Sequence, residues 1–132
     1  MADEKILVIE DDLFNMELAV DILIAKGYQV VSAENGFRAL KILKDARVDL
    51  IIMDIQLPDF DGISLCREIR KSPEYRKTPI VAFTAHAMKG DEEKFLSAGF
   101  TCYAAKPIDT RQFPLLIKHC LEGDCNGSDC SQ

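Results

Sequence analysis

The sequence predicts an α/β fold in which a parallel β-sheet carries helices on both faces. Five short apolar runs are spread along the 132 residues. Longer stretches, whose apolar residues recur at helical spacing, alternate with these runs. Strands that alternate with helices in this way are typical of βαβ units and of a sheet covered on both sides. The length suits one domain with its own core.

Each predicted strand is a short apolar segment that ends at a polar or turn residue. The first is apolar throughout and precedes two acids, and the second is rich in β-forming residues. The third and fourth are strongly apolar, and a Lys-Pro pair ends the fifth. In chain order, the predicted strands cover residues 5–9, 28–33, 49–53, 80–83 and 101–105.

The predicted helices follow from apolar spacing and from the residues at their ends. Asp12 is a suitable N-cap for the first helix, and Gly27 suits the position just past its end. Asn35 and Gly36 open the second helix, and Gly99 ends the fourth. In chain order, the predicted helices cover residues 13–26, 35–46, 62–71, 88–98 and 110–121.

Composition narrows the class of protein. The charge of 16 minus 22, or −6, argues against direct binding of nucleic acid, which draws most of its affinity from clustered basic residues. No apolar run is long enough for a membrane-spanning helix. The N-terminus lacks the basic start and long apolar region of a secretory signal, so we expect a cytoplasmic protein. The domain is predicted at residues 1–122, followed by a flexible polar tail at 123–132.

Polar residues follow four of the five predicted strands directly. Glu10 and Asp11 come after the first, Asp54 after the third, Thr84 after the fourth and Lys106 after the fifth. Sites in doubly wound sheets form outside the carboxyl ends of the strands. We therefore expect these side chains to converge at one edge of the sheet.

The chemistry expected of this cluster is phosphoryl transfer. Carboxylates about 5 Å apart repel each other by roughly 3 kcal/mol per pair at an effective dielectric near 20, and one lysine cannot offset three of them. Mg²⁺ suits such an all-oxygen cluster. The metal and Lys106 would neutralise phosphoryl oxygens, Thr84 would donate a hydrogen bond, and Asp54 would attack as the nucleophile.

Four motifs resemble the receiver domain of two-component response regulators. They are ILVIEDD at residues 6–12, MDIQLPDFDG at 53–62, FTAHA at 83–87 and AKPID at 105–109. The resemblance implies a flavodoxin-like fold, a five-stranded parallel sheet in the order 2-1-3-4-5. The chain resembles both single-domain regulators and the receiver modules of hybrid histidine kinases.

The resemblance also implies a role for each site residue. Asp54 would accept a phosphoryl group from a phosphohistidine on a partner protein. Asp11, Asp54 and the backbone carbonyl of Gln56 would bind Mg²⁺, and Glu10 would act largely through water. Among the remaining residues, Lys106 would contact the phosphoryl group, Thr84 and Tyr103 would form the switch, and the bond before Pro107 would be cis.

Two partner surfaces are expected. In the first helix Leu18, Ala19, Ile22 and Leu23 should pack on the sheet. A second apolar row would then face outward, formed by Met16, Val20 and Ile24. Together with Pro107 and Ile108 across the mouth of the site, this row would bind a histidine kinase or a histidine phosphotransfer protein. A neighbouring domain or a second copy is the alternative occupant. A downstream protein would bind the surface of the fourth helix, fifth strand and fifth helix.

Two other functions fit the sequence less well. A dehalogenase-type phosphatase also uses a strand-end Asp with Mg²⁺, but it needs a second Asp two residues on, where this chain has Gln56. We therefore expect no enzyme beyond a protein that catalyses its own phosphorylation and dephosphorylation. An unphosphorylated binding module would be expected to lack Asp54, the acidic pair or Lys106, and all are present.

Overall fold

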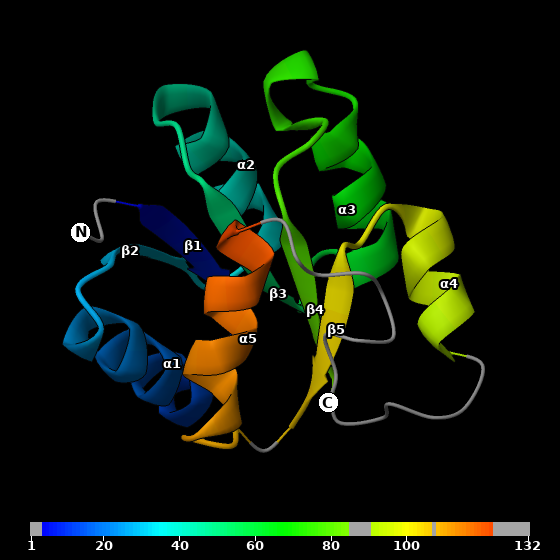
Figure 1. The fold of residues 1–132 in the computed structure, drawn as a ribbon. Coiled ribbons are helices and arrows are strands. Elements are labelled where there is room, and N and C mark those ends of the chain that lie inside the picture. Colours follow the sequence, from blue (N-terminus) through cyan, green and yellow to red (C-terminus); the bar gives the residue numbers. More distant parts are fainter. Residues whose placement is uncertain (1–3, 85–90, 107, 123–132) are drawn as a thin grey trace.

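The computed structural model describes residues 4–84, 91–106 and 108–122. Within this part of the chain, five parallel strands form one sheet in the order β2-β1-β3-β4-β5, which confirms the predicted fold (Figure 1). The strands are β1 (Lys5–Ile9), β2 (Gln29–Ala33), β3 (Leu50–Asp54), β4 (Ile80–Thr84) and β5 (Cys102–Ala105).

The strands are in a register that brings their carboxyl ends to one edge. The ends of β1 and β3 pair through Ile9 and Met53, and Asp54 pairs with Phe83 on β4. Thr84 pairs with Ala105 at the end of β5. Because β3 and β4 are buried along their whole length, the polar residues that end them are buried as well.

Helices cover both faces of the sheet (Figure 1). One face packs against α1 (Leu13–Ala25) and α5 (Gln112–Leu121). The other packs against α2 (Gly36–Asp45), α3 (Gly62–Arg70) and α4 (Asp91–Ala98), together with the short 3₁₀ turn η1 (Pro73–Tyr75). None of the helices in the described residues has the length and hydropathy needed to cross a bilayer.

The predicted helix ends are formed by the residues expected. Asp12 caps α1 by accepting a hydrogen bond from the Asn15 N–H at 3.2 Å, and Asn35 caps α2 by accepting one from the Arg38 N–H at 2.8 Å. Gly27 follows α1 with a φ of 93°, a conformation that glycine adopts without strain. Local sequence chemistry is therefore sufficient to place these ends.

The end of the chain differs from the prediction in its details. The structure begins α5 at Gln112, two residues later than expected, because the Asp109 carboxylate accepts hydrogen bonds from the N–H groups of Arg111 and Gln112. Pro107, the predicted first turns of α4 before Asp91 and the predicted tail lie outside the described residues.

The prediction for α1 is wrong in part. Ala19 and Leu23 are buried as expected, but Met16 is buried beside them and does not face outward. Val20 is half-buried against the same core, and only Ile24 of the predicted row is largely exposed. Apolar residues occur on nearly every side of this helix, so their spacing does not identify a single buried face.

Ile108 is a second correction to the predicted docking row. Its side chain is buried in the core on the α1 and α5 side of the sheet. It therefore does not offer a surface to a partner.

Candidate functional site

Three carboxylates meet at the carboxyl edge of the sheet. Glu10 and Asp11 follow β1, and Asp54 ends β3. One oxygen from each lies within 4.8 Å of the others. Glu10 and Asp54 are buried and Asp11 is exposed, so the cluster opens to solvent on one side. This geometry confirms the convergence that the sequence predicts.

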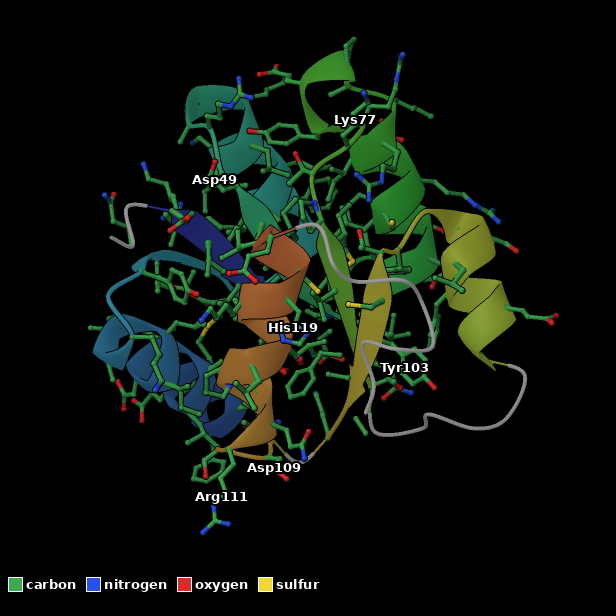
Figure 2. The ribbon with its side chains drawn as sticks, in the orientation of Figure 1. Asp49, Lys77, Tyr103, Asp109, Arg111 and His119 are labelled. Carbon is green, nitrogen blue, oxygen red and sulfur yellow. The ribbon has the colours of Figure 1, made fainter. Side chains whose placement is uncertain are left out.

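Figure 2 shows the two ends of the molecule. Asp49 and Lys77, which precede β3 and β4, lie at one end. Asp109, which follows β5, lies at the other, on the side where the strands finish. The carboxylate cluster belongs to this second end.

Lys106 joins the cluster from the residue after β5. Its Nζ lies 3.1 Å from Asp54 Oδ2 and 3.0 Å from Glu10 Oε1. The same ammonium lies 5.3 Å from the centroid of the Phe83 ring, within the range of a cation–π contact. The Lys106 ammonium is thus ion-paired with two buried carboxyl groups.

The pKa values follow from this crowding. Burial and the neighbouring Asp54 raise the pKa of Glu10 from 4.5 to about 7, although Lys106 and the Asp12 N–H oppose the shift. Burial alone would lower the pKa of Lys106, but its contacts with Glu10 and Asp54 outweigh burial and raise it. Lys106 is therefore charged at neutral pH, and Glu10 takes up a proton more readily than an exposed glutamate does.

The residues fit a hard divalent cation. Oε2 of Glu10 accepts a hydrogen bond from the Asp12 N–H at 3.2 Å. Oε1 is buried and, within the described residues, lies near Lys106 but makes no hydrogen bond of good geometry. The three carboxylates carry more negative charge than the one ammonium can neutralise, and the cluster is open to solvent at Asp11. Carboxylate oxygens with access to water are the ligands that Mg²⁺ prefers.

The loop after β3 is held against Asp54. The Gln56 N–H donates to Asp54 Oδ1 at 3.0 Å, and Gln56 forms an isolated antiparallel bridge with Asp61. The Gly62 N–H donates to the Ile55 carbonyl at 2.8 Å, and a Cβ at Gly62 would lie 2.7 Å from the Ile55 Cα. Residue 62 must therefore be glycine for the loop to close this tightly.

The two predicted switch residues lie on adjacent strands. Thr84 is buried at the end of β4, and its carbonyl accepts a hydrogen bond from the Lys106 N–H at 2.8 Å. Tyr103 is half-buried on β5, and its ring packs against Phe95 of α4 with 6.1 Å between ring centroids (Figure 2). Backbone contacts thus connect the carboxylate cluster to the strand that carries Tyr103. His86, two residues past Thr84, lies outside the described part.

Sequence reasoning missed two exposed residues beside the site. Leu13 and Phe14 form the start of α1, directly after the Asp12 cap, and are 72% and 73% exposed. Their position in the first turn, next to the acidic pair, is the signal that could have identified them. Together with Ile24 they are the large exposed apolar side chains of α1.

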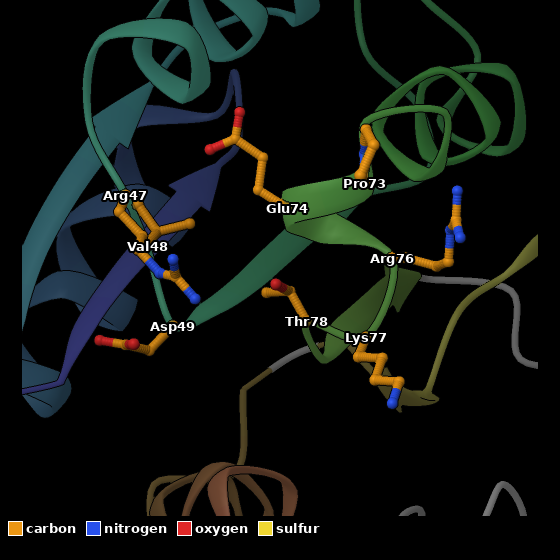
Figure 3. A pocket seen from close by; sticks show the side chains of 8 residues that line it. All are labelled: Arg47, Val48, Asp49, Pro73, Glu74, Arg76, Lys77 and Thr78. Carbon is orange, nitrogen blue, oxygen red and sulfur yellow. The ribbon is translucent and has the colours of Figure 1, made fainter.

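A pocket of about 540 Å³ lies at the opposite end of the molecule (Figure 3). It precedes β3 and β4 and is lined by side chains of both charges, namely Arg47, Val48, Asp49, Pro73, Glu74, Arg76, Lys77 and Thr78. None of the predicted site residues lines it. In Figure 3 the Arg76 and Lys77 side chains point in different directions, so these two basic groups do not converge on one ligand position.

Fold and site together define a receiver, a domain that carries a phosphoacceptor aspartate beside an acidic metal-binding cluster. The family model of the response regulator receiver domain matches residues 6–118. The chain therefore belongs to the response regulator receiver family, and it is a phosphoacceptor signalling switch of two-component systems.

Individual relatives agree with this assignment. The polar-differentiation response regulator DivK of Brucella anthropi is 39% identical over 118 residues, which are 89% of this chain and 96% of that protein. The receiver domain of the sensor histidine kinase PA1611 of Pseudomonas aeruginosa has a TM-score of 0.83 and 36% identity, covers 92% of this chain and 99% of its own, and was solved with a magnesium ion in its active-site cleft. Chemotaxis protein CheY4 of Vibrio cholerae shares the fold, with a TM-score of 0.86 at 24% identity over 90% of this chain and 99% of its own.

Proposed function

We propose that Asp54 accepts the phosphoryl group from a phosphohistidine of a partner protein, with Mg²⁺ bound beside it. The observation that carries this proposal is the placement of the Asp54 carboxylate. It ends a central strand, it contacts Lys106 at 3.1 Å, and it lies within reach of a common cation with Glu10 and Asp11.

Mg²⁺ would be held by Asp11, Asp54 and the backbone carbonyl of Gln56, with Glu10 acting through water. The solvent-exposed Asp11 carboxylate and its approach to within 4.8 Å of the Glu10 and Asp54 oxygens support this set. When bound, the metal supplies positive charge to the phosphoryl oxygens and relieves the repulsion among the carboxylates.

The chain's own residues account for the transfer. An Asp54 oxygen would bond to phosphorus while the bond from phosphorus to the histidine nitrogen breaks. With a proton on its other ring nitrogen, the partner's histidine would leave as neutral imidazole, and Asp54 would carry the phosphoryl group as an aspartyl phosphate. Lys106, already 3.1 Å from Asp54, would neutralise charge on the phosphoryl oxygens. The Gln56 N–H bond to Oδ1 would restrict the carboxylate to one orientation.

We also propose that the chain turns over no substrate other than its own phosphoryl group. The residue two positions after Asp54 is Gln56, whose amide cannot shuttle a proton. A dehalogenase-type phosphatase would need a carboxylate there, so hydrolysis of a separate phosphate ester is not expected.

The proposed switch connects the aspartyl phosphate to a downstream partner. Thr84 would move its hydroxyl toward the phosphoryl oxygens, and the Tyr103 ring would turn inward as a result. Because Tyr103 packs on Phe95, this movement would alter the surface of α4, β5 and α5. The phosphoryl group would then bias two arrangements of that surface.

The partner that donates the phosphoryl group would bind beside the start of α1. Leu13 and Phe14 are exposed next to Asp11, and Val20 and Ile24 extend the apolar surface along the helix. The helical hairpin of a histidine kinase or phosphotransfer protein would cover this surface and place its histidine over Asp54. Because such a phosphohistidine is made from ATP, we propose the cytoplasm as the compartment.

The proposal is tested by phosphorylation with a small donor. Phosphoramidate and Mg²⁺ should add one phosphoryl group to the wild-type chain, measured as intact mass, and the product should be labile to hydroxylamine. Asp54→Asn should abolish the adduct. Asp49→Asn, which changes an acid at the opposite end of the sheet, should leave it unchanged. Equal labelling of wild type and Asp54→Asn would show that the acceptor is another residue.

A further inference from the structure

Asp59 connects the loop after the phosphoacceptor to the start of α2. Its Oδ1 accepts a hydrogen bond from the Gly36 N–H at 2.8 Å, and its Oδ2 accepts one from the Phe37 N–H at 3.0 Å. The first N–H groups of a helix have no partner within the helix, so this carboxylate satisfies two of them. Burial would raise the pKa of Asp59, but the N–H groups of Gly36 and Phe37, together with those of Asp59 itself and Phe60, outweigh it and lower the pKa.

The neighbouring aromatic residue strengthens the same connection. A Cβ placed on Gly36 would lie 2.2 Å from the Phe60 ring, so the ring packs directly on the helix backbone. The rings of Phe60 and Phe37 also meet edge to face, with 5.2 Å between centroids. The tip of the loop and the first turn of α2 are thus packed against each other through both polar and apolar contacts.

The other end of this loop is attached to the phosphoacceptor itself. Gln56 donates its N–H to Asp54 and forms a bridge with Asp61. Residues 55–61 are therefore held at the Asp54 carboxylate, at the start of α3 and at the start of α2, and the Ile55 N–H also donates to the Phe83 carbonyl on β4 at 3.2 Å. Asp59 provides the side-chain hydrogen bonds between the tip of this loop and the start of α2, segments more than 20 residues apart in sequence.

We propose that Asp59 is a positioning residue for the phosphoacceptor site. It acts through the loop: by holding the tip on α2, it restricts the backbone of Gln56, whose carbonyl is a proposed ligand of Mg²⁺. This inference rests on the proposed function, since it concerns the affinity of that same metal site. Coupling between two sites is reciprocal, so Mg²⁺ in turn stabilises the contact between Asp59 and α2.

Asn35 provides a matched control on the same helix. Its side chain also caps α2, by accepting from the Arg38 N–H at 2.8 Å, but it does not belong to the loop. Loss of either cap should lower the melting temperature of the chain. Only loss of Asp59 should also release the loop tip.

The experiment is a Mg²⁺ titration of wild type, Asp59→Ala, Asp59→Asn and Asn35→Ala, followed by the amide NMR signals of residues 54–62. Both alanine variants should melt a few degrees lower than wild type. Asp59→Ala should bind Mg²⁺ about threefold more weakly, Asp59→Asn should recover part of the loss because its amide oxygen still accepts, and Asn35→Ala should bind as wild type does.

Hydrogen exchange of the wild-type chain gives a second readout that needs no variant. Added Mg²⁺ should slow the exchange of the Gly36 and Phe37 amides more than that of the Arg38 amide. Unchanged Mg²⁺ affinity in Asp59→Ala, or an equal loss in Asn35→Ala, would overturn the positioning role while the site itself still binds metal. A wild-type chain with no response to Mg²⁺ would instead overturn the proposed metal site, and the positioning role with it.

Discussion

Glu10 is a buried carboxyl group of the site whose pKa is raised by its surroundings. Its carboxylate is buried, it faces Asp54, and one of its oxygens makes no hydrogen bond within the described residues. A group whose pKa is raised on folding binds protons more tightly in the folded chain than in the unfolded one. The free energy of unfolding therefore depends on pH through Glu10.

The stability of the metal-free chain should fall as pH rises from about 4.5 to about 7, the ordinary and shifted pKa values of Glu10. Over this window the folded chain keeps a proton that the unfolded chain has lost, so the free energy of unfolding decreases with pH. Thermal melting at several pH values measures the trend. Glu10→Gln should flatten this part of the curve, and a wild-type curve that rises over the same window would show that Glu10 is ionised.

Mg²⁺ should stabilise the chain more at pH 8 than at pH 5.5. The cation needs ionised carboxylates, and protons compete with it at the lower pH. At tenfold excess over its dissociation constant, a ligand adds roughly 1.4 kcal/mol, which corresponds to a shift of a few degrees in melting temperature. Asp11→Ala should remove most of this shift. A full Mg²⁺ response in that variant would place the metal elsewhere.

Lys106 should contribute more to the free energy of unfolding than a lysine in an exposed ion pair does. Lys106→Met leaves Glu10 and Asp54 without their shared cation. We therefore expect the free energy of unfolding at pH 7.5 to fall by about 1–3 kcal/mol. This loss is smaller than for a fully buried ion pair, because Glu10 can take up a proton. Lys71→Met is the control, since its ion pair with Glu68 is exposed and should contribute less than about 1 kcal/mol. Urea denaturation measures both, and equal losses would contradict the assigned role.

At the scale of the element, the site was easier to predict than the helix beside it. Parallel strands finish at one edge, so the residues after each apolar run identified Glu10, Asp54 and Lys106 without knowledge of the fold's details. The first helix is apolar on nearly every side, and the burial of Met16 could not be read from its spacing. The contact between Asp59 and Gly36 has no local signature, because it joins segments 23 residues apart.

The start of α1 should be the part of that helix on which phosphotransfer depends. Phe14 is 73% exposed beside the acidic pair, and burying one such side chain in a complex contributes roughly 1.5–3 kcal/mol. Phe14→Asp should therefore slow transfer from a phosphorylated histidine partner by at least about tenfold. Labelling by phosphoramidate should be unchanged, because no group of the site is altered.

Leu115→Asp is the matched control for this experiment. Leu115 is also an exposed apolar residue, 58% accessible, but it lies on α5 and lines a pocket with Glu4 and Tyr28. These two residues directly precede β1 and β2, so the pocket is at the end of the sheet opposite the site. Its substitution should affect neither route. If Phe14→Asp and Leu115→Asp transfer at the wild-type rate, the partner binds another surface; if Phe14→Asp loses both routes, the variant has damaged the fold.

At the scale of the whole molecule, the site and the α4 surface are joined through the sheet. Lys106 follows β5 directly, Thr84 accepts a backbone hydrogen bond from it, and Tyr103 on the same strand packs against Phe95. The proposed switch would carry a change at Asp54 to α4 across these two adjacent strands. The described structure contains the parts of this route, although the residues between β4 and α4 lie outside it.

Thr84→Ala should separate phosphorylation from the switch. Beryllofluoride with Mg²⁺ mimics the aspartyl phosphate, and in the wild type it should shift the ring signals of Tyr103 and Phe95 in NMR spectra. The variant should still bind beryllofluoride, seen at the amides of residues 54–56, but the ring signals should stay near their free positions. Identical ring shifts in both proteins would show that Thr84 does not couple the site to α4.

The central claim is that Asp54 itself carries the phosphoryl group, and chemical mapping of that residue tests it most directly. Borohydride reduces an aspartyl phosphate to homoserine, whereas it leaves an unmodified aspartate intact. After treatment with phosphoramidate and Mg²⁺, then borohydride, the peptide that spans residues 54–67 should contain homoserine at position 54, and the same peptide from a sample without Mg²⁺ should contain aspartate. Homoserine at position 11, 59 or 61 with aspartate at 54 would contradict the account.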